Sequence, residues 1–349
     1  MENSGGKILS LESLLIGYRS GGRRSALIPS LTASVRKGEL IALIGQNGTG
    51  KSTLLRTITG LHPALKGNVI IRGKKLADYQ RYDLAKNIGY ISTEPVRVNN
   101  MKVIDLVRLG RYPHTSWTGK FKKEDHELVA DAIRKTGLED FTARYINELS
   151  DGERQRAMIA RILAQDAEIL VMDEPTAFLD IRSRYEMIHL LHDLSFSRGK
   201  TIIFSTHDML TAIGESDRIW LISADSFSDG APEDLILNGS FEKLFAGSVV
   251  KFNSSDATFS YRREMRGMVG IEADGIVKYW TEKAANRAGF EASDTVGGIR
   301  IKVIARDNGI KWQANRGTEV FAFSSLYDLV KWLGKAGDIK TSDTSGSSE

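Results

Sequence analysis

The sequence predicts an α/β fold with central parallel strands, followed by a small α+β domain. The apolar run LIALIG at 40–45 leads directly into a glycine-rich loop and a helical segment. Two further apolar runs, at 169–172 and 201–204, end in polar residues, as buried parallel strands do. Beyond residue 267, short alternating segments accompany two helical stripes. A length of 349 residues fits about two domains.

The composition is that of a globular protein, with 41% hydrophobic and 26% charged residues. No apolar run approaches the roughly 18 residues of a membrane span, and the N-terminus lacks a signal-peptide pattern, so we expect a cytoplasmic protein. The absence of cysteine excludes disulfides and thiolate sites. The chain has 15 Lys and Arg residues against 13 Asp and Glu residues after residue 250, and 33 against 31 up to it. Neither part concentrates positive charge, so no basic region predicts nucleic-acid binding.

The glycine-rich loop predicts a phosphate site. It reads Gly45-Gln46-Asn47-Gly48-Thr49-Gly50-Lys51-Ser52 and is followed by Thr53 and a helical segment. Glycines let backbone N–H groups turn toward phosphates, a lysine reaches the β and γ oxygens, and a serine hydroxyl binds Mg²⁺. The candidate nucleotide-binding residues are therefore Gly45, Asn47, Gly48, Gly50, Lys51, Ser52 and Thr53.

The candidate Mg²⁺-binding and catalytic residues follow two of the predicted strands. The run Ile169 to Met172 ends in Asp173 and Glu174; the aspartate is suited to holding Mg²⁺ and the glutamate to deprotonating an attacking water. The run Thr201 to Phe204 leads to His207, at the sheet edge where open α/β folds keep their ligands. A lone histidine is more often structural, and this alternative stays open for His207 on its sequence alone.

A predicted helix begins inside the stretch ELSDGERQR at 148–156. Ser150 and Glu153 form a capping-box pattern, and Met158, Ile159, Ile162 and Leu163 follow as an apolar stripe. Gly152 in the first turn destabilises this helix by roughly 0.5–1 kcal/mol relative to alanine. This cost leaves open what the helix end faces.

These motifs, in this order and spacing, resemble those of the ATP-binding cassette (ABC) ATPases. The resemblance covers residues from about 7 to about 245: Gly45–Thr53, LSDGE at 149–153, VMDEPTAFLD at 171–180 and STHD at 205–208. It implies a P-loop NTPase core of the ABC ATPase type, RecA-like with antiparallel β and helical subdomains. The helical subdomain would span about 96–155.

The resemblance also implies a role for each site residue. Tyr18 looks like the aromatic that stacks on adenine, although a half-buried strand-end tyrosine is the alternative. Asp173 resembles the Mg²⁺ ligand, Glu174 the catalytic carboxylate and His207 the γ-phosphate sensor. Ser150 and Gly152 would contact ATP held by Lys51 of a second copy, and Asp180 would cross to that copy.

The sequence departs from the family in two places. Asp151 and Glu153 stand where the family has glycine and glutamine. The glutamine that contacts Mg²⁺ in the family is missing; Thr93 takes its place by register, with Glu94 one residue later. Both are candidate metal contacts, and we expect hydrolysis with altered Mg²⁺ dependence.

Residues 101–147 resemble the helical subdomain of ATPases that drive uptake of iron chelates, haem and cobalamin. The resemblance rests on Gly110-Arg111-Tyr112-Pro113-His114 and on Leu179-Asp180-Ile181. His114 has no second ligand at metal-binding spacing, so we expect a loop residue that faces a partner.

We expect four consecutive segments. They are an ATPase domain at 1–247, which contains the helical subdomain, a connecting segment at 248–267, an α+β domain at 268–339 of β-α-β-β-β-α order, and a disordered tail at 340–349. In the α+β domain, the helical stripe of Ile276, Val277, Trp280 and Ala284, the turn Asn308-Gly309 and the cap residues Ser325 and Asp328 mark its elements. Its Trp and Phe residues are expected in the core. A regulatory or dimer-stabilising role is a hypothesis.

The sequence thus predicts an ATP- and Mg²⁺-dependent ATPase subunit of an ABC importer for iron-siderophore, haem or cobalamin-type cargo. Its expected partners are a second copy, a membrane permease and, indirectly, a substrate-binding protein, with the chain peripheral on the inner face of the cell membrane. The alternatives are a soluble ABC ATPase acting on nucleic acid or ribosomes, which usually carries a coiled coil or second cassette, and a module that only holds nucleotide.

Overall fold

The computed structural model describes residues 6–20, 23–93, 100–115, 119–261, 263–293, 298–306 and 309–337. The chain divides into two compact units, Met1–Phe259 and Ser260–Glu349. No helix in these described ranges is long and apolar enough to cross a membrane. The predictions made for Glu94, Asn308 and the tail at 340–349 lie outside the described residues.

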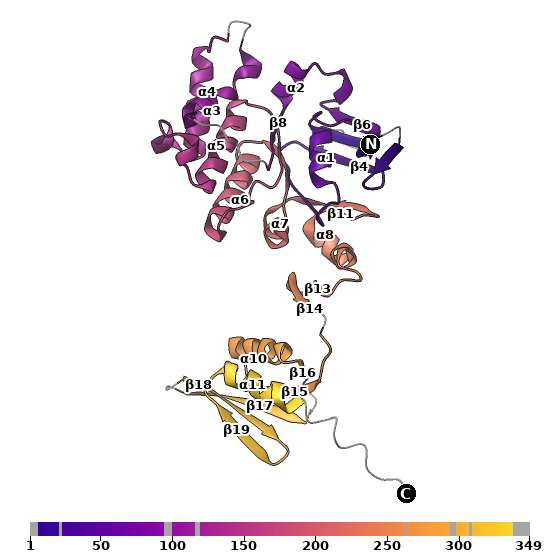
Figure 1. Ribbon diagram of the computed structural model, residues 1–349, viewed down its shortest axis with the longest axis vertical. Helices are drawn as coiled ribbons and strands as arrows, with labels where there is room; N and C mark the ends of the chain where they lie inside the picture. Colours follow the sequence, from indigo (N-terminus) through magenta and orange to yellow (C-terminus); the bar gives the residue numbers. More distant parts are fainter. Residues whose placement is uncertain are drawn as a thin grey trace. The chain divides into compact units, whose positions relative to one another are not determined.

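A six-stranded sheet forms the centre of the first unit (Figure 1). Its order is β12-β11-β5-β10-β9-β8, and every neighbouring pair is parallel except β11 and β12. The strands are β5 (Leu40–Gly45), β8 (Ile88–Ile91), β9 (Ile169–Met172), β10 (Thr201–Ser205), β11 (Arg218–Ile222) and β12 (Phe227–Gly230). Every residue of β5, β9 and β10 is buried, which explains their unbroken apolar runs. Because these three strands are parallel, the segments that follow them meet at one edge.

An antiparallel sheet of order β4-β1-β6-β7 forms the N-terminal part of this unit. It comprises β1 (Lys7–Leu15), β4 (Leu31–Arg36), β6 (Lys66–Ile71) and β7 (Lys74–Lys75), with a separate hairpin of β2 (Gly17–Ser20) and β3 (Arg23–Ala26). Helix α1 (Lys51–Ile58) shares a hydrophobic core with this sheet and with β5, through Leu54, Leu55 and Ile58. That packing fixes the helix after the glycine-rich loop.

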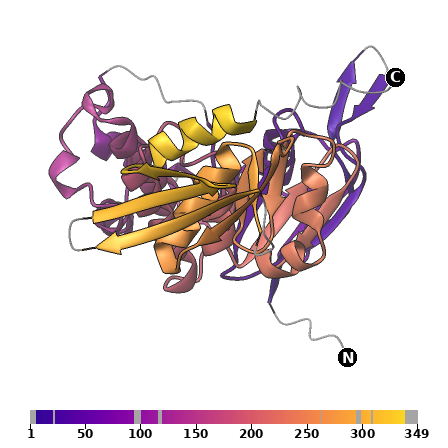
Figure 2. The same cartoon turned by 90° about the horizontal axis from the view of Figure 1, so that it is seen from below.

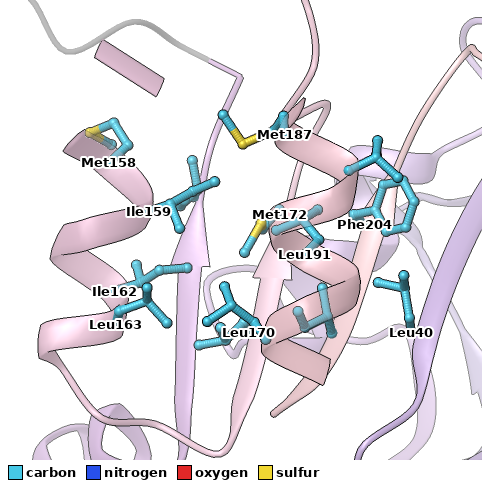
Figure 3. Close-up of a cluster of buried hydrophobic side chains, with 14 of the residues drawn as sticks. Leu40, Met158, Ile159, Ile162, Leu163, Leu170, Met172, Met187, Leu191 and Phe204 are labelled. Carbon is cyan, nitrogen blue, oxygen red and sulfur yellow. The ribbon is translucent and has the colours of Figure 1, made fainter. Parts of the chain in front are cut away.

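Helices form the rest of the first unit. They are α2 (Arg81–Asn87), α3 (Val103–Leu109), α4 (Lys123–Lys135), α5 (Asp151–Ala164), α6 (Ile181–Phe196), α7 (Met209–Glu215), α8 (Pro232–Leu237) and α9 (Ser240–Leu244), with short 3₁₀ turns at Leu76–Asp78, Tyr112–His114, Glu139–Phe141 and Ile146–Glu148. The predicted stripe of α5 is confirmed, because Met158, Ile159, Ile162 and Leu163 are all buried. Figure 3 shows this stripe beside Leu170 and Met172 of β9, with Met187 and Leu191 of α6 nearby. Helix α5 is thereby anchored to the sheet that carries Asp173.

The segment expected to connect the two domains forms a hairpin instead. Strands β13 (Val250–Asn253) and β14 (Thr258–Tyr261) pair with each other. Phe252 stacks on Phe241 with ring centroids 5.2 Å apart, and Phe259 meets Phe245 at 5.2 Å. These aromatic contacts bind residues up to 259 to the first unit, and the division between the units after Phe259 falls within the connecting segment expected at 248–267.

The second unit is a five-stranded sheet of order β16-β15-β17-β18-β19 with two helices. In chain order it comprises β15 (Gly267–Glu272), α10 (Gly275–Arg287), β16 (Phe290–Ala292), β17 (Ile299–Arg306), β18 (Gly309–Arg316), β19 (Glu319–Phe323) and α11 (Leu326–Gly337). Helix α10 contacts β15 and β16, α11 contacts β18 and β19, and the two helices touch each other (Figure 2). The expected order lacked the short strand β16, because three residues are too few to show a period.

The predicted inward face of α10 is partly wrong. Ile276 and Trp280 are 72% and 56% exposed, whereas Val277 packs on the core and Ala284 is buried. The indole of Trp312 donates a hydrogen bond to Thr281 Oγ1 at 3.0 Å, which turns Thr281 toward the sheet and Trp280 away from it. The cap of α11 is confirmed, since Ser325 Oγ accepts the Asp328 N–H at 3.2 Å.

Candidate nucleotide-binding and hydrolysis site

The glycine-rich loop lies between β5 and α1, as predicted. At Gly45 a Cβ would lie 2.5 Å from the carbonyl oxygen of Ile222, because β5 and β11 approach closely there. Gly50 caps α1 with a φ of +93°, a left-handed conformation that favours glycine. Gly48 also has a positive φ, of +80°, with open space around it. The loop therefore requires glycine at Gly45 for space and at Gly50 for backbone conformation.

Lys51 lies over this loop. Its Nζ donates to the carbonyl oxygens of Gly45 at 2.8 Å and Gln46 at 3.0 Å, which uses two of its three donors. Burial lowers the pKa of the ammonium, and the carboxylates of Glu174 and Asp173 oppose that shift. The Lys51 ammonium thus lies close enough to the two carboxylates that follow β9 to interact electrostatically with both.

Asp173 and Glu174 follow β9, and Ser205, the last residue of β10, joins them. Ser205 Oγ donates to Asp173 Oδ1 at 2.7 Å and accepts the backbone N–H of Glu174 at 2.8 Å. Asp173 is buried, and its N–H donates to Ile91 of β8 at 2.9 Å. The sequence motifs assigned no role to Ser205, although its place directly before Thr206 and His207 at a strand end is the signal that could have found it.

Glu174 and His207 form a hydrogen-bonded pair, with Glu174 Oε1 2.6 Å from His207 Nε2. The histidine is therefore not a core residue; its side chain is about half exposed and the carboxylate about a quarter. Glu174 has a φ of +50°, a conformation that residues other than glycine rarely adopt. A carboxylate held in this way, next to a cation and an imidazole, is a suitable general base.

The residues at this edge suit Mg²⁺ held jointly with phosphate oxygens. Among the described residues, no group of three or more His, Asp or Glu side chains forms a protein-only metal site. Mg²⁺ in nucleotide sites typically takes one or two protein oxygens and the phosphates, which Asp173 and Ser52 can provide. Ser52 is half-buried in the first turn of α1. Thr93 is half-buried two residues after β8, the strand whose Ile91 bonds Asp173.

Tyr18 stands beside the same helix. Its hydroxyl lies 3.0 Å from Thr53 Oγ1, while half of the side chain is exposed. The ring meets His62 in a T-shaped contact, with centroids 5.4 Å apart, and His62 bonds the carbonyl of Gly17 at 2.9 Å. An aromatic face is thus presented next to the phosphate loop, where a base can stack.

The N-terminal end of α5 has the predicted capping box. Ser150 Oγ accepts the Glu153 N–H at 3.3 Å, and Glu153 Oε2 accepts the Ser150 N–H at 2.8 Å. Asp151, which stands where the family has glycine, is paired with Arg154 at 2.8 Å. A Cβ on Gly152 would meet nothing closer than Ser183 Oγ at 3.5 Å, an ordinary contact. The packing of this chain therefore does not require a glycine at 152.

Asp180 lies next to this end of α5. It caps α6, and its side chain accepts the Ser183 N–H at 2.8 Å; this hydrogen bond lowers the pKa of the carboxylate. The hydrogen bonds of Ser150 and Asp180 stay within their own helix turns. The structure thus brings Lys51, Asp173, Glu174 and His207 together and leaves Ser150, Gly152 and Asp180 as a second group.

The opposite end of α5 is held by the Gly110–His114 segment. Arg111 is buried; its Nε donates to Asp125 at 2.8 Å and its Nη1 to the carbonyl of Ala164 at 2.7 Å. Burial alone would raise the pKa of Asp125, but the Lys122 N–H and the Arg111 guanidinium lower it overall. His114 bonds the carbonyl of Gln165 at 2.8 Å, so its imidazole is held by its own chain in a short 3₁₀ turn.

Two family models match the chain. The ABC transporter model matches residues 28–177, and the iron ABC transporter C-terminal domain model matches residues 266–334. The first range contains the phosphate loop, the α5 cap and Glu174. The second lies within the second compact unit.

Several characterised proteins are similar in sequence. The petrobactin import ATP-binding protein FpuC of Bacillus anthracis is 37% identical over 231 residues, which cover 66% of this chain and 85% of that protein. The ferric enterobactin transport ATP-binding protein FepC of Escherichia coli is 34% identical over 235 residues, covering 67% and 85%.

Solved structures share the fold of the first unit. A transporter described as of the metal-chelate type, in an inward-facing conformation, has a TM-score of 0.59 at 28% identity and covers 68% of this chain and 89% of that one. The dimeric cassette MJ0796 in a post-hydrolysis state with ADP and phosphate has a TM-score of 0.56 at 26% identity, covering 64% and 99%. With these relatives and this site, the chain belongs to the ATP-binding subunits of ABC transporters.

Proposed function

We propose that this ABC ATPase powers an importer of ferric siderophores or a related iron chelate. The observation that carries the ATPase part is the Glu174–His207 pair, which lies at the ends of adjacent parallel strands and close to Lys51. A base, an imidazole and a phosphate-binding cation at one sheet edge form the set that hydrolysis of a terminal phosphate requires.

The residues have distinct roles in this proposal. Lys51 and the loop N–H groups bind the β and γ phosphates, and Tyr18 stacks on adenine. Ser52 and Asp173 hold Mg²⁺, which neutralises phosphate charge when bound. Glu174 takes a proton from the attacking water, and His207 fixes the orientation of that carboxylate and contacts the γ phosphate. Ser205 keeps Asp173 and Glu174 in place by bonding both.

A second copy of the chain completes the site. Ser150 and Gly152 present a helix N-terminus, which favours anions, yet their bonds within the chain do not extend to the phosphate loop. Since Gly152 is not needed for packing, a close approach from outside the chain explains its cost to the helix. Arg154 neutralises Asp151 and removes its charge as an obstacle to ATP.

The relatives support the proposed cargo and location. FpuC and FepC are named for petrobactin import and ferric enterobactin transport, and the matched C-terminal model is an iron-transporter domain. The chain would then act on the inner face of the cell membrane with a permease, and a substrate-binding protein would deliver the chelate.

Replacing Glu174 with Gln tests the ATPase assignment. We expect ATP hydrolysis to fall by about 10²–10⁴-fold, the usual contribution of a general base, with ATP binding retained. Released phosphate and bound nucleotide are measured on the same sample. A variant that hydrolyses ATP at the parent rate removes Glu174 from its role.

Replacing Thr93 with Gln tests the metal assignment. If Thr93 occupies the position of the missing Mg²⁺ contact, a longer side chain that reaches the ion shifts the Mg²⁺ concentration for half-maximal hydrolysis. An unchanged Mg²⁺ profile argues against the assignment.

The cargo is tested in cells. Deleting the gene should abolish uptake of ⁵⁵Fe supplied as a ferric siderophore, and the parent chain, but not the Glu174→Gln variant, should restore it. Normal siderophore uptake in the deletion strain, with a defect for another cargo, would contradict the iron assignment while leaving the ATPase intact.

A further inference from the structure

We propose that His62 is a positioning residue for nucleotide binding, which fixes the plane of the Tyr18 ring for stacking on adenine. The inference rests on the stacking role proposed above for Tyr18. It goes beyond that role because the sequence motifs assign nothing to His62, and because it separates what places the Tyr18 ring from what orients it.

The hydroxyl contact of Tyr18 places the ring but does not orient it. The hydroxyl oxygen lies 3.0 Å from Thr53 Oγ1, in the first turn of α1. In a tyrosine this oxygen lies on the axis about which the ring rotates, and the torsion about that axis has a broad energy minimum. The ring can therefore turn without losing the contact with Thr53. A second contact is needed to set its plane.

The imidazole of His62 supplies that second contact. The centroids of the two rings lie 5.4 Å apart at an interplanar angle of 67°, a T-shaped geometry that aromatic pairs prefer. Unlike the hydroxyl contact, this geometry depends on the plane of the Tyr18 ring. The Tyr18 side chain is still 51% exposed, so the contact with His62 leaves surface on which a base can stack.

His62 is itself held at its backbone and at its side chain. Its N–H donates to the carbonyl of Arg56, in the last turn of α1, at 3.0 Å. Its Nε2 lies 2.9 Å from the carbonyl oxygen of Gly17, and since a carbonyl only accepts, Nε2 carries the hydrogen. A Cβ on Gly17 would lie 2.0 Å from the carbonyl oxygen of Ser25, where β2 and β3 pair closely. The imidazole is therefore fixed before any nucleotide binds.

Helix α1 connects this arrangement to the phosphate loop. The helix begins at Lys51, carries Thr53 in its first turn and holds the backbone of His62 after its last turn. Tyr18 thus contacts the first turn directly and the residues after the last turn through the His62 ring. A site built on a rigid helix holds its geometry more precisely than one built on loops. The base and the phosphates are then positioned by the same element.

Calorimetry on the full chain tests the role of His62. The probes are ADP and inorganic pyrophosphate, because both carry a diphosphate and only ADP carries adenine. We expect Tyr18→Ala to weaken ADP binding about tenfold or more and His62→Ala about two- to tenfold, the usual effects of base stacking and of an aromatic pair. Neither variant should change pyrophosphate binding. The control is His114→Ala, whose imidazole also bonds a carbonyl, at 2.8 Å, and which should bind ADP like the parent.

Two further variants decide whether His62 acts through Tyr18. When Tyr18→Ala is already present, His62→Ala should cause no further loss of ADP affinity. His62→Phe keeps a ring without the N–H and should recover part of the affinity that His62→Ala loses. Additive losses in the double variant, no recovery in His62→Phe, or equal losses for ADP and pyrophosphate would each overturn the inference.

The Tyr18→Ala result separates this inference from the proposed function. If Tyr18→Ala weakens ADP binding and His62→Ala does not, the positioning role is refuted and the stacking role of Tyr18 stands. If Tyr18→Ala binds ADP like the parent, the stacking role is refuted and the positioning role with it. Should His62→Ala fail to fold, His62→Gln takes its place in every comparison, because it keeps an N–H for the Gly17 carbonyl and lacks only the ring.

Discussion

The two ends of helix α5 differ in their hydrogen bonding and in their burial. At the C-terminal end, Arg111 and His114 bond the last carbonyls and are held in a closed, buried arrangement. At the N-terminal end, the side-chain hydrogen bonds of the exposed Ser150 stay within its own turn, and Gly152 is only half-buried, beside Ser183. The core shown in Figure 3 joins the helix from Met158 to Leu163 to β9. One end thus stabilises the fold, and the other is the end at which we propose that a ligand and a second copy bind.

This contrast predicts that substitutions at the closed end lower stability, whereas those at the open end change function with little effect on stability. The Arg111–Asp125 pair should give the largest effect. Replacing Arg111 with Met leaves Asp125 buried without its cation, which typically destabilises by about 3–5 kcal/mol. Chemical denaturation measures the free energy of unfolding. Arg134→Met is the control, since its pair with Asp131 is exposed and should contribute at most about 1 kcal/mol.

The sign of the pH dependence sharpens this prediction. In the parent, the depressed pKa of Asp125 stabilises the fold above the unfolded-state value of about 3.9 and that stabilisation is lost as the pH falls through the folded-state pKa. In Arg111→Met, burial without a cation raises the pKa of Asp125, so acid should stabilise the variant relative to the parent. A constant difference between the two from pH 7 to pH 4 would show that the pair does not titrate as described.

Gly110 should give the next largest effect. A Cβ there would lie 2.0 Å from the carbonyl oxygen of Arg161 in α5, so Gly110→Ala forces the two helices apart and should cost about 1–3 kcal/mol or more. Gly214→Ala is a matched control, because nothing lies within 4 Å of its Cβ. Thermal unfolding of both variants is compared; similar melting temperatures would mean that the α3–α5 contact is not tight.

Ser150 provides a smaller effect on stability at the open end. Replacing it with Ala removes the α5 cap at a typical cost of about 1 kcal/mol. Ser325→Ala removes the equivalent cap of α11 and serves as control. Both variants should lose similar stability, but only Ser150→Ala should lower the ATPase rate. If Ser150→Ala and Ser325→Ala hydrolyse ATP at equal rates, the role of Ser150 is structural only.

Gly152 should give the smallest effect on stability, and of opposite sign. Gly152→Ala meets only ordinary contacts and should stabilise the helix by roughly 0.5–1 kcal/mol. The added methyl group should nevertheless block ATP-dependent dimerisation, measured by sedimentation in the Glu174→Gln background. Gly214→Ala should gain similar stability and dimerise normally. A Gly152→Ala protein that dimerises like the parent would refute the close approach.

The sequence alone was sufficient to predict functional residues that directly follow an apolar strand and contacts that lie within one helix turn. The loop Gly45–Ser52, the acidic end of β9 and His207 each follow an apolar strand, and parallel strands bring such ends together. The capping box of α5 was equally readable, because both partners lie within one turn.

Other features depend on long-range packing. No local pattern shows that Trp280 faces outward; that follows from the hydrogen bond between Trp312 and Thr281, which fixes the rotation of α10. The Gly110–His114 segment was recognised as a motif, yet its task of holding the end of α5 required contacts about fifty residues away.

The sequence by itself indicated the family, the candidate nucleotide-site residues and the strands that carry them, because each depends on residue type and short spacing. Tertiary structure alone decided that Ser205 links Asp173 to Glu174, that Arg154 neutralises Asp151, and that the β13–β14 hairpin completes a pocket beside the catalytic pair. The physical reason is that contacts between distant segments are chosen by the burial of whole faces, which no single stretch of sequence records.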